Sequence, residues 1–186
     1  MKLALSLILS VLALTAAAFG QQNDSTSLKK SRMADFSQMV GTWRGSGWIQ
    51  QGNSREEFSG MQVVQKKMDG LALLIDGKFV NPQGKMVHET LNVLTYDEEA
   101  KNYKFSTFLA SGKNEIQDLK IVGDRYVWGF QVPKTGAVKY TIEVNGDAWT
   151  EIGEFSRDGK AWTKMLEMSL TRVKLKRPPG SGSPSN

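Results

Sequence analysis

The stretch GTWRGSGW, residues 41–48, places three glycines and two tryptophans in eight positions. A glycine-rich phosphate loop needs a preceding strand, G-x-G-x-x-G spacing and a following helix, or a lysine followed by serine or threonine. The sequence around residues 41–48 has neither pattern. As a strand, it puts Trp43, Gly45 and Gly47 on one face. We therefore interpret it as the first strand of a closed sheet, in which glycines on the inner face relieve crowding.

The rest of the chain repeats short β-type runs that turn residues interrupt. Asn-Gly and Asp-Gly pairs are the strongest short hairpin signals, and both occur here. The nine interruptions fall at 50–54, 68–70, 81–85, 96–102, 111–114, 122–124, 133–136, 145–147 and 157–160. They leave ten strands, mostly of eight to twelve residues, joined by short loops. This spacing predicts an antiparallel meander.

Alternation within these runs predicts how the sheet buries its apolar face. In residues 136–144, for example, Val138, Tyr140 and Ile142 share one face, and polar residues share the other. Only residues 33–41 have helical spacing, and that segment is too short to cover a ten-stranded sheet. The fold class we predict is therefore all-β: a single antiparallel ten-stranded up-and-down barrel with a short N-terminal helix.

The two ends of the chain differ from this pattern. Residues 1–20 combine an N-terminal lysine, an apolar run and small residues, which is typical of a secretory signal peptide cleaved before Gln21. The sequence thus predicts an exported protein, periplasmic or secreted, with no transmembrane segment after cleavage. Residues 21–33 and 177–186 are polar and poor in large apolar side chains, so we expect a flexible segment and a disordered tail around a barrel domain at 34–176.

Composition excludes several classes of partner. The chain has no cysteine, so it has neither disulfides nor thiolate metal sites. Its pI of about 9.4 comes from the ends, because residues 33–171 hold 16 basic and 18 acidic side chains. A nucleic-acid-binding surface needs a basic stripe on the fold itself, so we predict no nucleic-acid partner. The basic ends are expected to make at most a weak contact with an anionic surface.

Two motifs carry a resemblance to known families. Residues 41–47 match the G-x-W-x-G-x-G pattern of nitrobindins and the G-x-W start of lipocalin-like (calycin) barrels. Residues 155–174, FSRDGKAWTKMLEMSLTRVK, resemble the end of a lipocalin-like secreted bacterial family of unknown function. The resemblance covers nearly the whole mature domain. It implies that Trp43 plugs one end of the barrel and that an arginine of the last strand, here Arg172, stacks on it.

Nitrobindins hold haem through a histidine near the C-terminal strand, and this chain departs from that pattern. Its single histidine is His88, in the fourth predicted strand. Because His88 shares a face with Met86 and Thr90, opposite the apolar side chains, we expect it to be exposed. Met165 or Met168 could supply only a weak axial ligand. The sequence therefore predicts no bound cofactor, and a nitrobindin-like haem protein is an alternative.

The remaining candidate residues indicate binding. One histidine, no cysteine, no H-E-x-x-H and no G-x-S-x-G leave no recognisable catalytic constellation, so we predict that the protein is not an enzyme. Barrels of this size can hold a small ligand. We predict a largely apolar ligand in the lumen, and a filled structural barrel of the cell envelope is a second alternative. The apolar side chains expected to bind it are Tyr103, Phe105, Tyr126, Trp128, Phe130, Tyr140 and Met168.

Glu151 and Lys164 are two polar residues on predicted lumen faces. The hairpin that joins their strands puts them within diagonal reach. They form either an inward salt bridge or a pair that orients the ligand. A β-bulge could instead shift one of them to the outer face.

Overall fold

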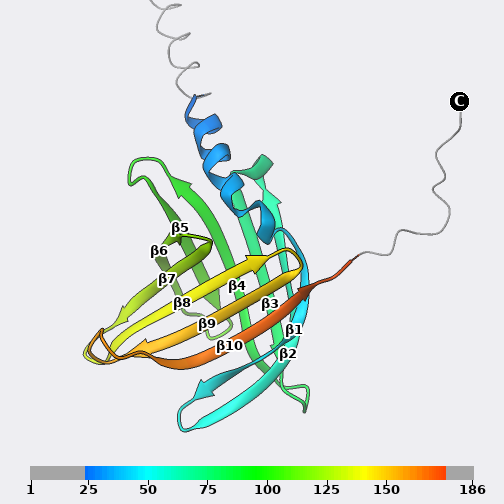
Figure 1. Ribbon diagram of the computed structural model, residues 1–186, viewed down its shortest axis with the longest axis vertical. Helices are drawn as coiled ribbons and strands as arrows, with labels where there is room; N and C mark the ends of the chain where they lie inside the picture. The colour runs from blue at the N-terminus through cyan, green and yellow to red at the C-terminus, as the bar shows by residue number, and fades with distance from the viewer. Residues whose placement is uncertain (1–23, 175–186) are drawn as a thin grey trace, which may run out of the picture.

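The computed structural model describes residues 24–174, and it is a closed antiparallel barrel of ten strands (Figure 1). The predicted fold class is confirmed. Each strand pairs with its neighbours in the sequence, and β1 pairs with β10 to close the barrel. The strands are β1 (Gly41–Gln51), β2 (Ser54–Lys67), β3 (Ala72–Val80), β4 (Met86–Asp97), β5 (Asn102–Leu109), β6 (Asn114–Val122), β7 (Arg125–Val132), β8 (Gly136–Asn145), β9 (Ala148–Ser156) and β10 (Thr163–Arg172).

The predicted signal peptide (1–20) and disordered tail (177–186) lie outside the described residues. Within residues 24–174, no helix has the length and apolar character that crossing a membrane would require.

Helical structure begins earlier than the sequence indicated. Residues 24–33, for which we expected irregular chain, form an α-helix that continues into the 3₁₀-helix η1 (Ala34–Met39). Polar side chains hold this helix to the barrel: Lys29 pairs with Glu98 at 3.5 Å, and Lys30 pairs with Asp69. Met33 at its end is fully buried. Composition alone did not predict an ordered helix here, because the residues that pair with Lys29 and Lys30 are far away in the sequence.

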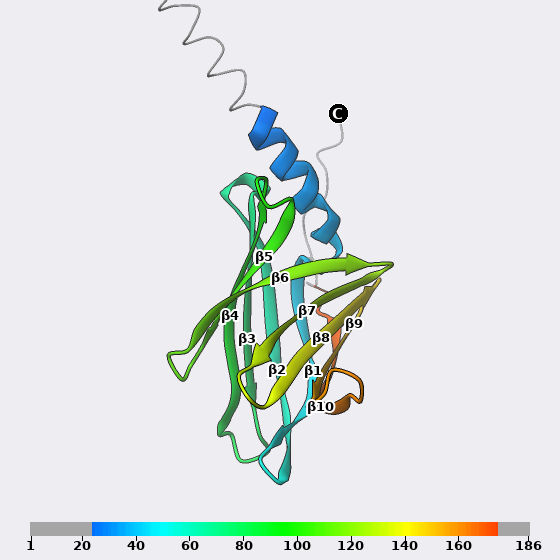
Figure 2. The same ribbon diagram turned by 90° about the vertical axis from the view of Figure 1, so that its left-hand side faces the viewer.

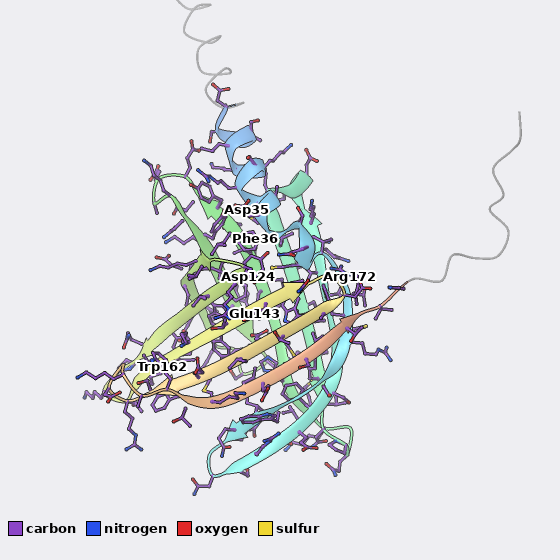
Figure 3. All side chains as sticks on the ribbon, viewed as in Figure 1. Asp35, Phe36, Asp124, Glu143, Trp162 and Arg172 are labelled. Atoms are coloured by element: carbon purple, nitrogen blue, oxygen red, sulfur yellow. The ribbon has the colours of Figure 1, made fainter. Side chains whose placement is uncertain are left out.

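The helix and η1 cover one end of the barrel (Figures 1 and 2). Phe36 inserts between the rings of Tyr103 and Tyr126, with centroid distances of 4.8 and 4.9 Å. Asp35 accepts a hydrogen bond of 2.7 Å from the Tyr103 hydroxyl, and Figure 3 shows Asp35 and Phe36 together at this end. The barrel is therefore capped on one side.

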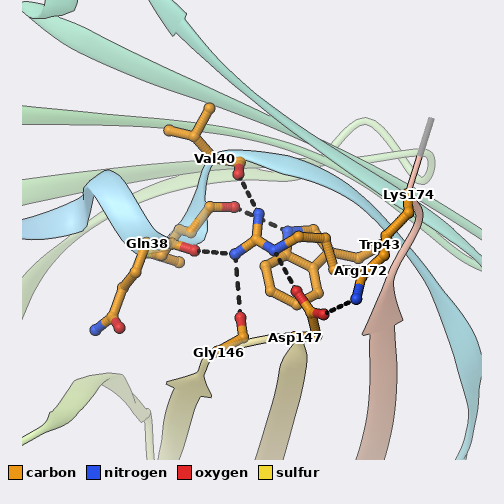
Figure 4. A network of polar contacts seen from close by, with 8 residues as sticks. Gln38, Val40, Trp43, Gly146, Asp147, Arg172 and Lys174 are labelled. Carbon is orange, nitrogen blue, oxygen red and sulfur yellow. Dashed lines mark hydrogen bonds and ion pairs between the residues drawn. The ribbon is translucent and has the colours of Figure 1, made fainter. Parts of the chain in front are cut away.

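Trp43 and Arg172 meet beneath this cap, as the resemblance implied. They are directly paired residues of β1 and β10, and the guanidinium carbon lies 4.0 Å from the indole centroid. The indole N–H donates a 2.8 Å hydrogen bond to the Met39 carbonyl. Arg172 donates to the carbonyls of Gln38, Val40 and Gly146 and pairs with Asp147 at 3.4 Å (Figure 4). One arginine thus links η1, the β8–β9 turn and the closing strand pair.

The inner-face glycines of β1 and β2 allow neighbouring strands to approach closely. A Cβ atom at Gly45 would lie 2.1 Å from the carbonyl oxygen of Ser169, and one at Gly60 would lie 2.0 Å from that of Lys78. These oxygens belong to backbone that cannot move aside without breaking strand pairing. Only glycine fits at these positions.

Candidate functional site

A cavity of about 230 Å³ occupies the lumen below the cap. Its walls come from β2 to β10, and Leu109, Lys113 and Asn114 beside the β5–β6 turn line its outer part. That turn is at the end of the barrel opposite the helix, because the strands run antiparallel from the capped end. The cavity is therefore closed by η1 at one end and approached from the other.

Several cavity-lining side chains are polar and buried, which the prediction of an apolar lumen did not anticipate. Gln62, Thr90, Asn92 and Gln117 are only 5% to 8% exposed. Four further buried polar atoms of lining residues have no hydrogen-bond partner within residues 24–174: Gln62 Nε2, Thr107 Oγ1, Gln117 Oε1 and Trp128 Nε1. The lumen is therefore polar as well as aromatic.

The polar face of β4 lies inside the barrel, contrary to our expectation for His88. His88, Thr90 and Asn92 line the cavity, whereas Leu91 on the opposite face is 40% exposed. The His88 ring lies near Phe58 and Phe79, with centroid distances of 6.3 and 6.0 Å. Burial lowers its pKa, so the imidazole is neutral at pH 7. The error arose from assigning the more apolar face of β4 to the interior.

Glu151 projects into the cavity from β9. Its direct neighbours in the sheet are Met168 on β10 and Ile142 on β8. Burial raises the pKa of this carboxyl to about 7, and the nearby indole N–H of Trp149 only partly offsets the effect. Burial together with the Glu151 charge also raises the pKa of the Tyr140 phenol. Glu151 is in no ion pair among residues 24–174.

Lys164 does not meet Glu151, so the predicted pair is wrong. The pairing of β9 with β10 shifts between Lys164 and Leu166, and this β-bulge turns Lys164 outward. There it pairs with Glu167 at 3.0 Å in an exposed position. The bulge was one of the alternatives that the sequence left open.

The predicted aromatic set divides into two groups. Phe105, Trp128, Phe130 and Tyr140 line the cavity together with Met168. Trp128 and Tyr140 stack with a centroid distance of 4.3 Å and an interplanar angle of 11°. Tyr103 and Tyr126 instead contact Phe36 under the cap and do not line the cavity, which corrects their predicted role.

Sequence reasoning missed other lining residues. Trp149 is two residues before Glu151 on the same strand face, so its role could have been predicted from Glu151. Gln62, Thr90, Asn92, Thr107 and Gln117 gave no such signal, because a polar residue on a strand usually faces solvent.

Strands β6 and β7 move apart beside the cavity. β6 and β7 pair only between Leu119–Val122 and Arg125–Trp128, and Figure 2 shows the two strands diverging from there. Glu115 and Gln117 on one side of the separation and Phe130 on the other line the cavity.

No group of three or more histidine, aspartate or glutamate side chains within residues 24–174 could hold a metal ion.

Comparisons with known proteins show the fold. No protein-family model and no curated protein sequence matches the chain. The structure is similar to that of Rv2717c from M. tuberculosis, with a TM-score of 0.58, 16% identity and coverage of 76% of this chain and 97% of that one. It is also similar to the S-type phycobiliprotein lyase CPES from Guillardia theta, with a TM-score of 0.51, 14% identity and coverage of 76% and 92%. Both are calycin-like ten-stranded barrels.

Proposed function

We propose that this barrel binds a small molecule in its lumen and does not transform it chemically. The observation that carries the proposal is the cavity of about 230 Å³ in the lumen, whose walls combine aromatic rings with buried polar side chains. Ligand sites typically have this combination of an apolar wall and a few polar groups that orient the ligand.

The size and lining of the cavity define the ligand class. A volume of about 230 Å³ exceeds the roughly 150 Å³ that holds benzene and is below the roughly 300–1,000 Å³ of drug-sized sites. Aromatic walls favour a flat ring system, and the polar atoms require several hydrogen-bonding groups. The ligand we propose is therefore a one- or two-ring molecule that is more polar than the largely apolar ligand predicted from the sequence.

The absence of catalysis is part of the proposal. The similar phycobiliprotein lyase is an enzyme by name, so the fold is compatible with either role. In this chain the single histidine packs near Phe58 and Phe79, and the sequence has no cysteine nucleophile. A triad or zinc site of recognisable spacing is also missing from the sequence.

Export to the periplasm or exterior is proposed from residues 1–20, and weak contact with an anionic surface is proposed from the basic ends.

The first prediction tests ligand binding directly. Native protein purified from its own host and denatured is expected to release one small molecule, identified by mass spectrometry. Trp128→Ala should weaken binding of that molecule by about 2 kcal/mol or more, because a stacked aromatic wall is lost. The matched control is Gln131→Ala on the outer face of the same strand, which should bind normally. An empty extract would favour a filled structural barrel instead, and equal binding of a released molecule by both variants would exclude the Trp128 wall as its site.

Haem is the second candidate, because His88 faces the lumen rather than solvent. The cavity does not fit it well: its volume of about 230 Å³ is below the roughly 300–1,000 Å³ of sites for drug-sized ligands, and a haem needs a site at least of that size. Strand β10 also has no histidine, and its residue at the cavity is Met168.

The second prediction is accordingly that added haem gives no Soret band from a stoichiometric complex, measured by absorbance titration. His88→Ala should leave that titration unchanged. Stoichiometric uptake by the wild type that is lost in His88→Ala would establish the haem alternative.

A further inference from the structure

Among residues 24–174, Glu151 and Glu115 are the acidic side chains that line the cavity. Glu115 is exposed on β6 and accepts a 2.9 Å hydrogen bond from Gln117. Glu151 is half-buried and has the Trp149 indole near it, but no lysine or arginine of the described chain pairs with it, and Lys164 points outward. A carboxylate partly removed from water and without a cation is costly, and a positively charged partner offsets that cost.

The surrounding walls favour a positive charge. Trp128, Tyr140 and Trp149 line the same cavity as Glu151, together with Phe105 and Phe130. The faces of aromatic rings carry partial negative charge and attract cations, most strongly when the site is removed from water. A carboxylate surrounded by aromatic rings is therefore complementary to an organic cation and repels an anion.

The other titratable side chains that line the lumen do not change its preference for a cation. His88 on β4 is neutral at pH 7 because burial lowers its pKa, and the raised pKa of Tyr140 on β8 keeps that phenol neutral. Lys113 and Glu115 lie in exposed positions near the β5–β6 turn, and their opposite charges offset each other. When Glu151 is ionised, the net charge of the titratable side chains that line the lumen is therefore about −1.

We infer that the ligand carries a protonated amine, and that Glu151 binds this group as its counter-ion inside the aromatic lumen. The inference rests on the proposed function, since it specifies the chemistry of the same site. Gln62, Thr90 and Asn92 line the same cavity, so the body of the ligand also carries hydrogen-bonding groups. The ligand class is a small molecule with an aromatic ring and an alkylamine group.

The experiment uses three probes that share a phenylethyl body and differ in charge: phenethylamine, 2-phenylethanol and 3-phenylpropionate. Binding to ligand-stripped protein is measured by isothermal titration calorimetry between pH 6 and pH 8. We expect phenethylamine to bind on the order of tenfold more tightly than the alcohol at pH 8, because a charge-assisted hydrogen bond replaces a neutral one. The acid should bind most weakly. Affinity for the amine should rise with pH, because Glu151 must lose its proton to pair.

Variants assign the effect to Glu151. Glu151→Gln should lower the affinity for phenethylamine on the order of tenfold, remove its rise with pH and leave 2-phenylethanol binding intact. The matched control is Glu154→Gln: Glu154 lies on the same strand and pairs outside the barrel with Lys139 at 2.8 Å. All three probes should bind this control as they bind the wild type.

The outcomes separate the two proposals. If the alcohol or the acid binds as tightly as the amine, the amine inference is wrong, while small-molecule binding in the lumen stands. The inference is equally overturned if Glu151→Gln binds phenethylamine normally. If none of the probes binds the wild type, the result counts against the lumen as a small-molecule site and against the inference with it.

Discussion

Trp43→Ala is expected to lower the free energy of unfolding by about 3–5 kcal/mol, the cost of truncating a fully buried large aromatic side chain. Trp43 is completely inaccessible to solvent and packs against Trp149 with a centroid distance of 5.5 Å. The substitution also removes the ring beneath Arg172 and the hydrogen bond to Met39. Chemical denaturation monitored by far-ultraviolet circular dichroism measures the change.

Trp48→Ala provides a matched control on the same strand. Trp48 has its own arginine, with Arg55 lying 4.0 Å from the indole centroid, and its N–H donates to Glu167 at 3.3 Å. It lies on the outer face, where a cation–π contact is worth only about 0.5–1 kcal/mol. The free energy of unfolding should therefore fall much less in Trp48→Ala than in Trp43→Ala. Equal losses would show that Trp43 does not serve as the plug of the capped end.

Glu151→Gln is expected to stabilise the ligand-free protein at pH 8, by at most about 3 kcal/mol, since each tenfold change in an acid constant corresponds to about 1.4 kcal/mol. Burial raises the folded-state pKa of Glu151 from 4.5 to about 7. The folded protein therefore binds more protons than the unfolded chain between these values. The contribution of Glu151 to the free energy of unfolding is fully present below pH 4.5 and is lost as the pH rises through about 7.

The measurement is the difference in free energy of unfolding between variant and wild type across pH 4.5 to 8. Taking the difference removes the opposite contribution of His88, whose lowered pKa makes stability rise with pH. Glu154→Gln removes a carboxylate from the outer face of the same strand and so separates burial from the simple loss of a charge. A difference that stays constant with pH would mean that Glu151 is not desolvated in the folded protein.

The fold was predictable because its signals are local. Nine turn signals and strict alternation in runs such as residues 136–144 determine ten hairpin-connected strands without any knowledge of distant contacts. The contact of Trp43 with Arg172 was implied by the resemblance to lipocalin-like barrels, and the faces of both residues in the first and last strands permitted it.

The candidate site was less predictable, for physical reasons that differ between residues. On β4 the more polar face, with Thr90 and Asn92, is the one that lines the cavity. Alternation alone then gives the wrong orientation. Lys164 was misplaced by one irregular pair, and a bulge reverses every face assignment on one side of it. The helix at 24–33 depends on ion pairs with Asp69 and Glu98, which no local pattern reveals.

The closing strand pair has a consequence for how the chain folds. Every other pair in the barrel joins strands adjacent in the sequence, and such hairpins form within about 1–10 μs. Residues paired between β1 and β10, such as Trp43 and Arg172, are separated by nearly the whole domain, so their meeting carries the largest loop-closure entropy. A sheet that lacks β10 would have two open edges, so we expect the joining of the first strand to the last to be a late step of folding. Arg172 is the residue at which η1, the β8–β9 turn and that closing pair come together.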